Sequence, residues 1–162
     1  IIALRKKIGK LPEHVRLINA DTPISTWSLF QAMDYCLTVR GTVGIEAAML
    51  GKVVLTAGTG RYDRHGFTHD FSSSKEYLQC LQHIEDIEKP SSSMKELAER
   101  YAYGVFICRP LKLQTVSLGF KRDNKASMLV NVNMPAIGKF HKAEDLNEIS
   151  RWIGSKEDDY LD

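Results

Sequence analysis

The alternation of apolar and polar segments between residues 35 and 58 predicts a compact strand–helix–strand unit. Two nearly continuous apolar runs, at residues 35–39 and 53–57, flank a short apolar-rich segment at residues 43–50. That segment ends at Gly51, and glycine is a common stop signal for helices. Buried strands joined by a short helix in this order are typical of a parallel βαβ unit.

Segments on the N-terminal side extend this pattern. Residues 15–18 predict a short strand and residues 27–33 predict a helix. Three apolar strands that alternate with helices indicate an α/β fold, and we expect a Rossmann-like, three-layer α/β/α domain with a mainly parallel sheet. The chain opens at Ile1 within a helical pattern that ends at Gly9, so we also expect a domain upstream of this sequence.

The C-terminal half is helical at first and then less regular. Runs of serine precede two amphipathic stretches, which predict helices that reach Ile87 and Cys108. Residues 113–120 and 126–132 alternate loosely and fit strands, a helix or an extended loop, whereas residues 143–153 predict a helix.

This change of pattern predicts two parts. Residues 1–110 are expected to form the Rossmann-like domain, and residues 111–162 a C-terminal extension.

Composition narrows the class of protein. The 162 residues suffice for one well-buried core, and the net charge of +2 is too small to indicate a nucleic-acid partner. Three widely spaced cysteines form no metal-type pair, and we expect reduced thiols in a cytosolic protein. No apolar run approaches the ~18–20 residues that cross a bilayer.

The turn at residues 40–44 is the strongest candidate for chemistry. Backbone N–H groups at a helix N-terminus lack intrahelical partners and lie at the positive end of the helix dipole, so they attract anions. Gly41 lets an anion approach the backbone, and the Thr42 hydroxyl can either cap the helix or bond a phosphate oxygen. An ordinary capped turn fits the same residues, because a glycine-rich turn alone is a weak motif.

Two charged residues flank this turn. Arg40 fits either neutralisation of a bound phosphate or an ion pair with Asp34 or Glu46. Glu46 lies one helical turn beyond Thr42, where a carboxylate can accept hydrogen bonds from ribose or sugar hydroxyls. A solvent-exposed glutamate is the ordinary alternative.

A polar stretch at residues 58–70 follows the second apolar run. Long polar loops after the carboxyl end of a parallel strand are where ligands bind in such sheets. Arg61 offers donors suited to a diphosphate, and His65 can exchange a proton near neutral pH. The stretch also contains Tyr62, Gly66, Phe67, Thr68 and Asp70.

Two motifs in these segments resemble bacterial capsule and surface polysaccharide biosynthesis proteins. The first is Thr-Val-Arg-Gly-Thr-Val-Gly-Ile-Glu-Ala-Ala-Met-Leu-Gly-Lys at residues 38–52, followed by Ala57-Gly58. The second is Tyr62 followed by Gly-Phe-Thr-x-Asp at residues 66–70. The resemblance covers roughly residues 12–85, and Val53 stands where the family usually has proline. These proteins are similar to the C-terminal, donor-binding half of GT-B glycosyltransferases.

The resemblance implies a nucleotide-sugar site in residues 1–110 and an extension, residues 111–162, that braces a missing N-terminal domain. His65 and Glu46 become the candidate catalytic residues. Neither a metal ion nor a cofactor is expected besides the nucleotide-sugar substrate. The implied donor- and phosphate-binding residues are Arg40, Gly41, Thr42, Val43, Gly44, Glu46, Arg61, Tyr62, Gly66 and Thr68.

The implied function is transfer of a sugar from a nucleotide-activated donor to a surface or capsular polysaccharide. The partners would be the donor, a saccharide acceptor and the missing N-terminal domain, so we expect this chain to be inactive alone. The implied location is cytoplasmic, with peripheral association at inner-membrane polysaccharide machinery as an option. Two alternatives stay open: a non-catalytic binding or assembly module, and a nucleotide-sugar 2-epimerase-like enzyme. The absence of G-x-G-x-x-G disfavours a dehydrogenase.

Overall fold

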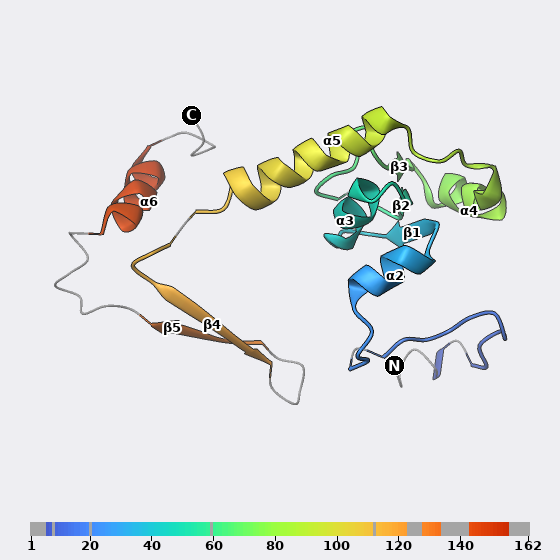
Figure 1. Ribbon diagram of the computed structural model, residues 1–162, viewed down its shortest axis with the longest axis horizontal. Helices are drawn as coiled ribbons and strands as arrows, with labels where there is room; N and C mark the ends of the chain where they lie inside the picture. The colour runs from blue at the N-terminus through green and yellow to red at the C-terminus, as the bar shows by residue number, and fades with distance from the viewer. Residues whose placement is uncertain are drawn as a thin grey trace. The chain divides into compact units, whose positions relative to one another are not determined.

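The computed structural model describes most of the chain (Figure 1). The chain divides into two compact units, Ile1–Arg100 and Tyr101–Asp162, and the first holds the candidate site. The described residues are 6–7, 9–19, 21–58, 60–111, 113–122, 128–133 and 143–155.

A small parallel sheet forms the centre of the first unit. Its strands are β1 (Tyr35–Thr38), β2 (Val53–Thr56) and β3 (His69–Asp70), in the order β1-β2-β3, and both neighbouring pairs are parallel. Helix α3 (Val43–Met49) connects β1 to β2 and packs on both. The predicted strand–helix–strand unit and the α/β class are confirmed, whereas a complete three-layer Rossmann-like domain stays a prediction.

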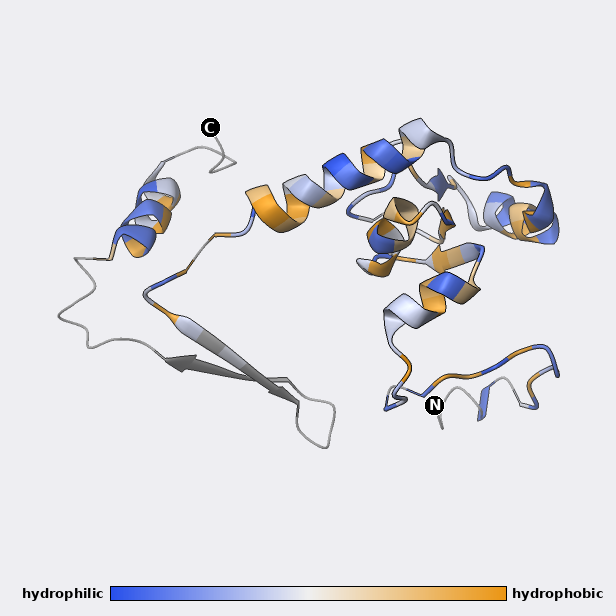
Figure 2. Ribbon diagram, in the orientation of Figure 1, coloured by the Kyte–Doolittle hydropathy of each residue, from blue (hydrophilic) through white to orange (hydrophobic). Residues whose placement is uncertain are grey.

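The hydrophobic sequence explains why β2 lies in the middle. All four of its residues are buried, and Figure 2 shows β1 and β2 coloured as hydrophobic. Helix α3 buries Ile45, Ala47 and Ala48, and the two alanines let its backbone come close to the sheet. Removal of this apolar surface from water supplies the main driving force for the unit.

The third strand is not the predicted one. Residues 15–18 form no strand, and Val15 and Ile18 are 38% and 45% exposed. The dipeptide His69–Asp70 takes the place beside β2 instead. An apolar run predicts a strand only if a partner strand is available, and here the Thr56 hydroxyl donates a hydrogen bond to the Asp70 carboxylate (2.7 Å) and fixes a polar segment in that place.

The helices of the first unit largely follow the predicted ranges. Helix α2 begins after Ser25, whose hydroxyl accepts the Ser28 N–H as an N-cap. The predicted helix to Ile87 stops earlier and continues as a 3₁₀ turn, η1. Besides α3, the helices are α2 (Thr26–Ala32), α4 (Ser74–Gln82), η1 (Ile84–Asp86) and α5 (Ser92–Tyr103), and the last three residues of α5 belong to the second unit.

The second unit contains a π-helical turn, an antiparallel pair of strands and a helix. The turn η2 (Gly104–Cys108) follows α5, so the predicted helical stretch to Cys108 is confirmed with a change of helix type. Strands β4 (Ser117–Arg122) and β5 (Met128–Asn133) confirm the strand alternative for this region. Helix α6 spans Glu144–Gly154.

Among the described helices, none is both long and apolar enough to span a bilayer. Cys36 is buried in β1, and burial raises the pKa of its thiol because a thiolate there would lose hydration.

Candidate functional site

The carboxyl ends of the three parallel strands lie in one row. Thr38 pairs with Thr56 in the β1–β2 register, and Thr56 pairs with Asp70 in the β2–β3 register. The segments that leave these residues therefore emerge at the same edge of the sheet. Ligands of parallel α/β sheets bind at this edge, so the row defines the candidate site.

Tyr62 ties the two sequence motifs together. Its side chain is 1% exposed, and its hydroxyl donates a hydrogen bond to the Gly41 carbonyl oxygen at 2.8 Å. The ring also lies against Gly44: a Cβ there would lie 2.8 Å from Cζ of Tyr62 and 3.0 Å from Cγ2 of Thr38. Gly44 therefore makes room for Tyr62 rather than presenting a surface to a ligand.

The loop after β2 also contacts the end of β1. A Cβ at Gly60 would lie 3.2 Å from the Val39 carbonyl oxygen, and one at Gly58 would lie 3.5 Å from Cγ1 of Val39. The turn at residues 40–44 and the loop at residues 58–68 thus form one contiguous surface. A side chain at position 60 would press on the backbone of Val39, the residue after β1.

The Asp70 carboxylate holds this loop in place through hydrogen bonds. Its Oδ1 accepts hydrogen bonds from the hydroxyls of Thr56 (2.7 Å) and Thr68 (2.8 Å). Its Oδ2 accepts the backbone N–H of Arg64 at 2.7 Å, where Arg64 has a left-handed φ of 64°. A carboxylate with several donors holds an irregular segment in one conformation, which pre-arranges the polar surface above it.

The remaining predicted site residues differ in their exposure. Thr42 is the N-cap residue of α3, and its side chain makes no capping hydrogen bond. His65 stacks on Phe67, with ring centroids 6.5 Å apart. The exposed members are Arg40, Gly41, Thr42, Arg61, His65 and Gly66; the half-buried ones are Val43, Glu46 and Thr68.

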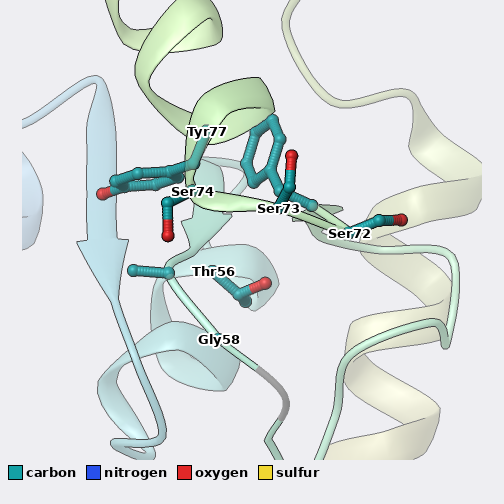
Figure 3. Close-up of a pocket in the computed structure, with 8 residues that line it drawn as sticks. Thr56, Gly58, Ser72, Ser73, Ser74 and Tyr77 are labelled. Atoms are coloured by element: carbon teal, nitrogen blue, oxygen red, sulfur yellow. The ribbon is translucent and has the colours of Figure 1, made fainter.

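The structure adds residues to this edge that were not among the predicted site residues. A cavity of about 230 Å³ opens between the ends of β2 and β3 and the start of α4 (Figure 3). It is lined by Thr56, Ala57, Gly58, Phe71, Ser72, Ser73, Ser74 and Tyr77. The three serines look like a helix cap in the sequence, and only their position after a third strand reveals the cavity.

The chemistry available at this edge is that of hydroxyls, backbone amides and arginine side chains. Arg40 and Arg61 both lie on the surface formed by the turn and the loop, and each suits a phosphate or carboxylate. Within the described residues, no group of three or more His, Cys, Asp or Glu side chains is placed to hold a metal ion.

Comparison with known proteins gives one family. A family model described as "Capsule polysaccharide biosynthesis protein" matches residues 5–99, which is more than half of the chain and includes the whole sheet and its edge. Neither a curated protein nor a solved structure matches the chain.

Proposed function

Because the chain belongs to the capsule polysaccharide biosynthesis family, we propose that it is the donor-binding part of a glycosyltransferase that builds a capsular polysaccharide. Its ligand would be a nucleotide-activated sugar, held at the carboxyl edge of the β1-β2-β3 sheet. A saccharide acceptor and a further domain would complete the reaction.

The observation that carries this proposal is the hydrogen bond from Tyr62 to the Gly41 carbonyl. It joins the turn at residues 40–44 to the loop at residues 58–68 in one polar surface. A nucleotide sugar has a charged phosphate part and an uncharged, hydroxyl-rich part, and it needs both kinds of contact within a short distance. Arg40, Arg61 and the Thr42 hydroxyl suit the phosphates, and the Glu46 carboxylate suits hydroxyl groups.

The proposed mechanism is transfer without a metal ion. The arginines neutralise the phosphate as its bond to the sugar carbon breaks. The activation barrier falls because the negative charge that develops on the leaving phosphate meets positive groups that are already in position. His65 is placed on the same loop and can give a proton to the leaving phosphate. An acceptor hydroxyl, deprotonated by a base outside this chain, attacks the sugar carbon and forms the new glycosidic bond.

A thermal-shift experiment tests donor binding directly. The 162-residue chain is titrated with CMP, UDP, GDP and CDP beside the variants Thr42→Ala and Glu46→Ala. One nucleotide is expected to stabilise the chain saturably, by about 2.7 kcal/mol at a hundredfold excess over its Kd. Both variants should weaken this effect.

Thr26→Ala is the matched control, because Thr26 is also exposed at the start of a helix but lies in α2, away from the sheet's carboxyl edge. It should leave the nucleotide effect unchanged. If a folded chain responds to none of the four nucleotides, the donor-binding proposal is wrong for this chain, and the non-catalytic assembly module becomes the better explanation.

A further inference from the structure

We propose that the cavity lined by Thr56, Ser74 and Tyr77 is a subsite for a single sugar ring, separate from the phosphate-binding turn. The inference rests on the proposed function and extends it by giving the uncharged part of a ligand its own place. We refer to this cavity, bounded by the ends of β2 and β3 and the start of α4, as the ring pocket.

Size is the first argument. The ring pocket has a volume of about 230 Å³. Pockets that enclose a whole drug-sized ligand measure about 300–1,000 Å³, so this one holds a single ring rather than an entire nucleotide sugar.

Charge is the second argument, and it disfavours phosphate. Among the described residues that line the ring pocket there is no lysine, arginine or histidine. Two carboxylates border it instead: Asp70 accepts the Thr56 hydroxyl, and Glu76 accepts the Ser72 N–H at 3.0 Å. The Ser73 hydroxyl accepts the Glu76 N–H at 3.2 Å. Two backbone N–H groups at the start of α4, those of Ser72 and Glu76, are therefore already paired within the chain, and the Glu76 carboxylate places a negative charge there.

The lining chemistry is the third argument. Figure 3 shows Ser74 and Tyr77 on one side of the ring pocket and Thr56 and Gly58 on the other. Tyr77 is half-buried and packs edge-on against Phe71, with centroids 5.3 Å apart, so its ring is held in place. The Ser74 hydroxyl has no hydrogen-bond partner among the described residues.

A sugar ring matches this lining. Its C–H groups carry a partial positive charge that favours the negative face of an aromatic ring, and its hydroxyls exchange hydrogen bonds with serine and threonine. The ring pocket approaches the segment that leads into the turn: Gly58 lines it, and a Cβ at Gly58 would lie 3.5 Å from Cγ1 of Val39, the residue before Arg40. The ring could come from the donor or from the acceptor chain, and the two sources are separable by experiment.

Saturation-transfer NMR on the 162-residue chain tests the ring pocket. The probes are the methyl glycosides of glucose, galactose, N-acetylglucosamine and glucuronic acid. At least one probe should receive saturation from the wild-type chain. Tyr77→Leu should weaken its binding about three- to tenfold, as expected for loss of an aromatic contact, and Ser74→Ala should weaken it less.

Tyr77→Phe keeps the aromatic face and should bind the probe as the wild type does. Tyr103→Leu, at a tyrosine that is 61% exposed at the end of α5, is the control for a general effect of the substitution. Saturation of no probe by a folded wild-type chain, or equal saturation in Tyr77→Leu, overturns the proposal.

Measuring nucleotide binding as well distinguishes failure of the ring-pocket proposal from failure of the donor-site proposal. Binding of CMP, UDP, GDP or CDP should depend on Thr42 and not on Tyr77; weaker nucleotide binding in Tyr77→Leu would mean that the pocket holds a base, which also overturns the proposal. If the ring belongs to the donor, Thr42→Ala should weaken binding of that ring when it is presented as part of the nucleotide sugar. A ring from the acceptor should be unaffected by that change.

Discussion

Gly44 and Tyr62 lie in different segments and depend on each other. Gly44 is buried in the first turn of α3, and the Tyr62 ring fills the space that a side chain at position 44 would need. The Tyr62 hydroxyl then reaches the Gly41 carbonyl. One residue without a side chain thus permits the contact that joins the two polar segments of the site.

Gly44→Ala is therefore expected to destabilise the chain, although alanine normally favours a helix over glycine. The new Cβ would lie 2.8 Å from Cζ of Tyr62, so the ring must move and its hydrogen bond to Gly41 is lost. We expect a loss of about 1–3 kcal/mol in the free energy of unfolding, measured by urea denaturation.

Gly154→Ala is the control for this change, because Gly154 lies in α6 and a Cβ at this position would have nothing within 4 Å of it. There, helix propensity alone acts and stability should stay the same or rise by up to about 1 kcal/mol. Equal effects of the two substitutions would show that Gly44 and Tyr62 are not in contact in solution.

The sequence predicted Gly44 and Tyr62 as site residues but did not predict that they pack on each other. Gly44 and Tyr62 both stood among the expected donor contacts, because the resemblance to capsule polysaccharide biosynthesis proteins implied them. The structure buries both, since Tyr62 packs on Gly44 across a separation in sequence that no local pattern reveals. Thr42, by contrast, is exposed and makes no side-chain capping bond, and its role as a phosphate contact stays a prediction.

At the scale of elements, β3 is a strand that the hydrophobic pattern of the sequence does not predict. Strands β1 and β2 were predicted from their apolar runs, and a strand buried on both faces leaves such a run in the sequence. Strand β3 has two polar residues, and its place depends on hydrogen bonds to Asp70 from Thr56, Thr68 and Arg64. Thr68 and Arg64 are near Asp70 in sequence, but Thr56 is 14 residues away, and only the fold brings its hydroxyl to the carboxylate.

Asp70→Asn is expected to release the loop above β3. An amide offers one acceptor oxygen where the carboxylate offers two, and its NH₂ group would face a donor. We expect a loss of about 1.5–3 kcal/mol in unfolding free energy, as for a hydrogen bond to a charged group. The Arg64 amide should also exchange its hydrogen faster, which NMR can follow.

Asp86→Asn provides the comparison. The Asp86 side chain is 76% exposed, and its contact with His83 spans 3.8 Å, so the substitution should change stability by less than about 0.5 kcal/mol. Unchanged exchange at Arg64 in the Asp70 variant would contradict the role given to this carboxylate.

At the scale of the whole chain, the two units differ in how their sequences specify them. In the first unit, strands β1 and β2 and the helices were predictable from apolar runs and stop signals, whereas β3 was not. In the second, residues 113–120 and 126–132 left strand, helix and loop open, and the structure selects an antiparallel pair. A two-stranded pair has no buried strand between neighbours, so its sequence lacks a strong apolar run. Outside this pair, Asp145 at the start of α6 bonds Thr115 in the segment before β4, a contact 30 residues apart in sequence that no local pattern predicts.

Asp145 gives the second unit an acid-sensitive contact. Its carboxylate accepts the backbone N–H groups of Gln114 and Thr115, both at 2.8 Å, as well as the Thr115 hydroxyl. The Thr115 hydroxyl bond is the largest cause, followed by its backbone N–H, and together these bonds lower the pKa of Asp145 to about 2. They favour the ionised form in the folded chain.

Acid should therefore weaken the second unit. A carboxyl with a lowered pKa stabilises the folded state above its unfolded pKa of about 3.9, and this contribution disappears as pH falls through the folded value of about 2. The carboxyl ¹³C shift of Asp145 should titrate near 2 in the wild type and higher in Thr115→Val. Fluorescence of Trp152, in a Trp27→Phe background, should report acid unfolding that Asp145→Asn makes less dependent on pH. A wild-type titration near 3.9 would show that the contact with Thr115 does not persist in solution.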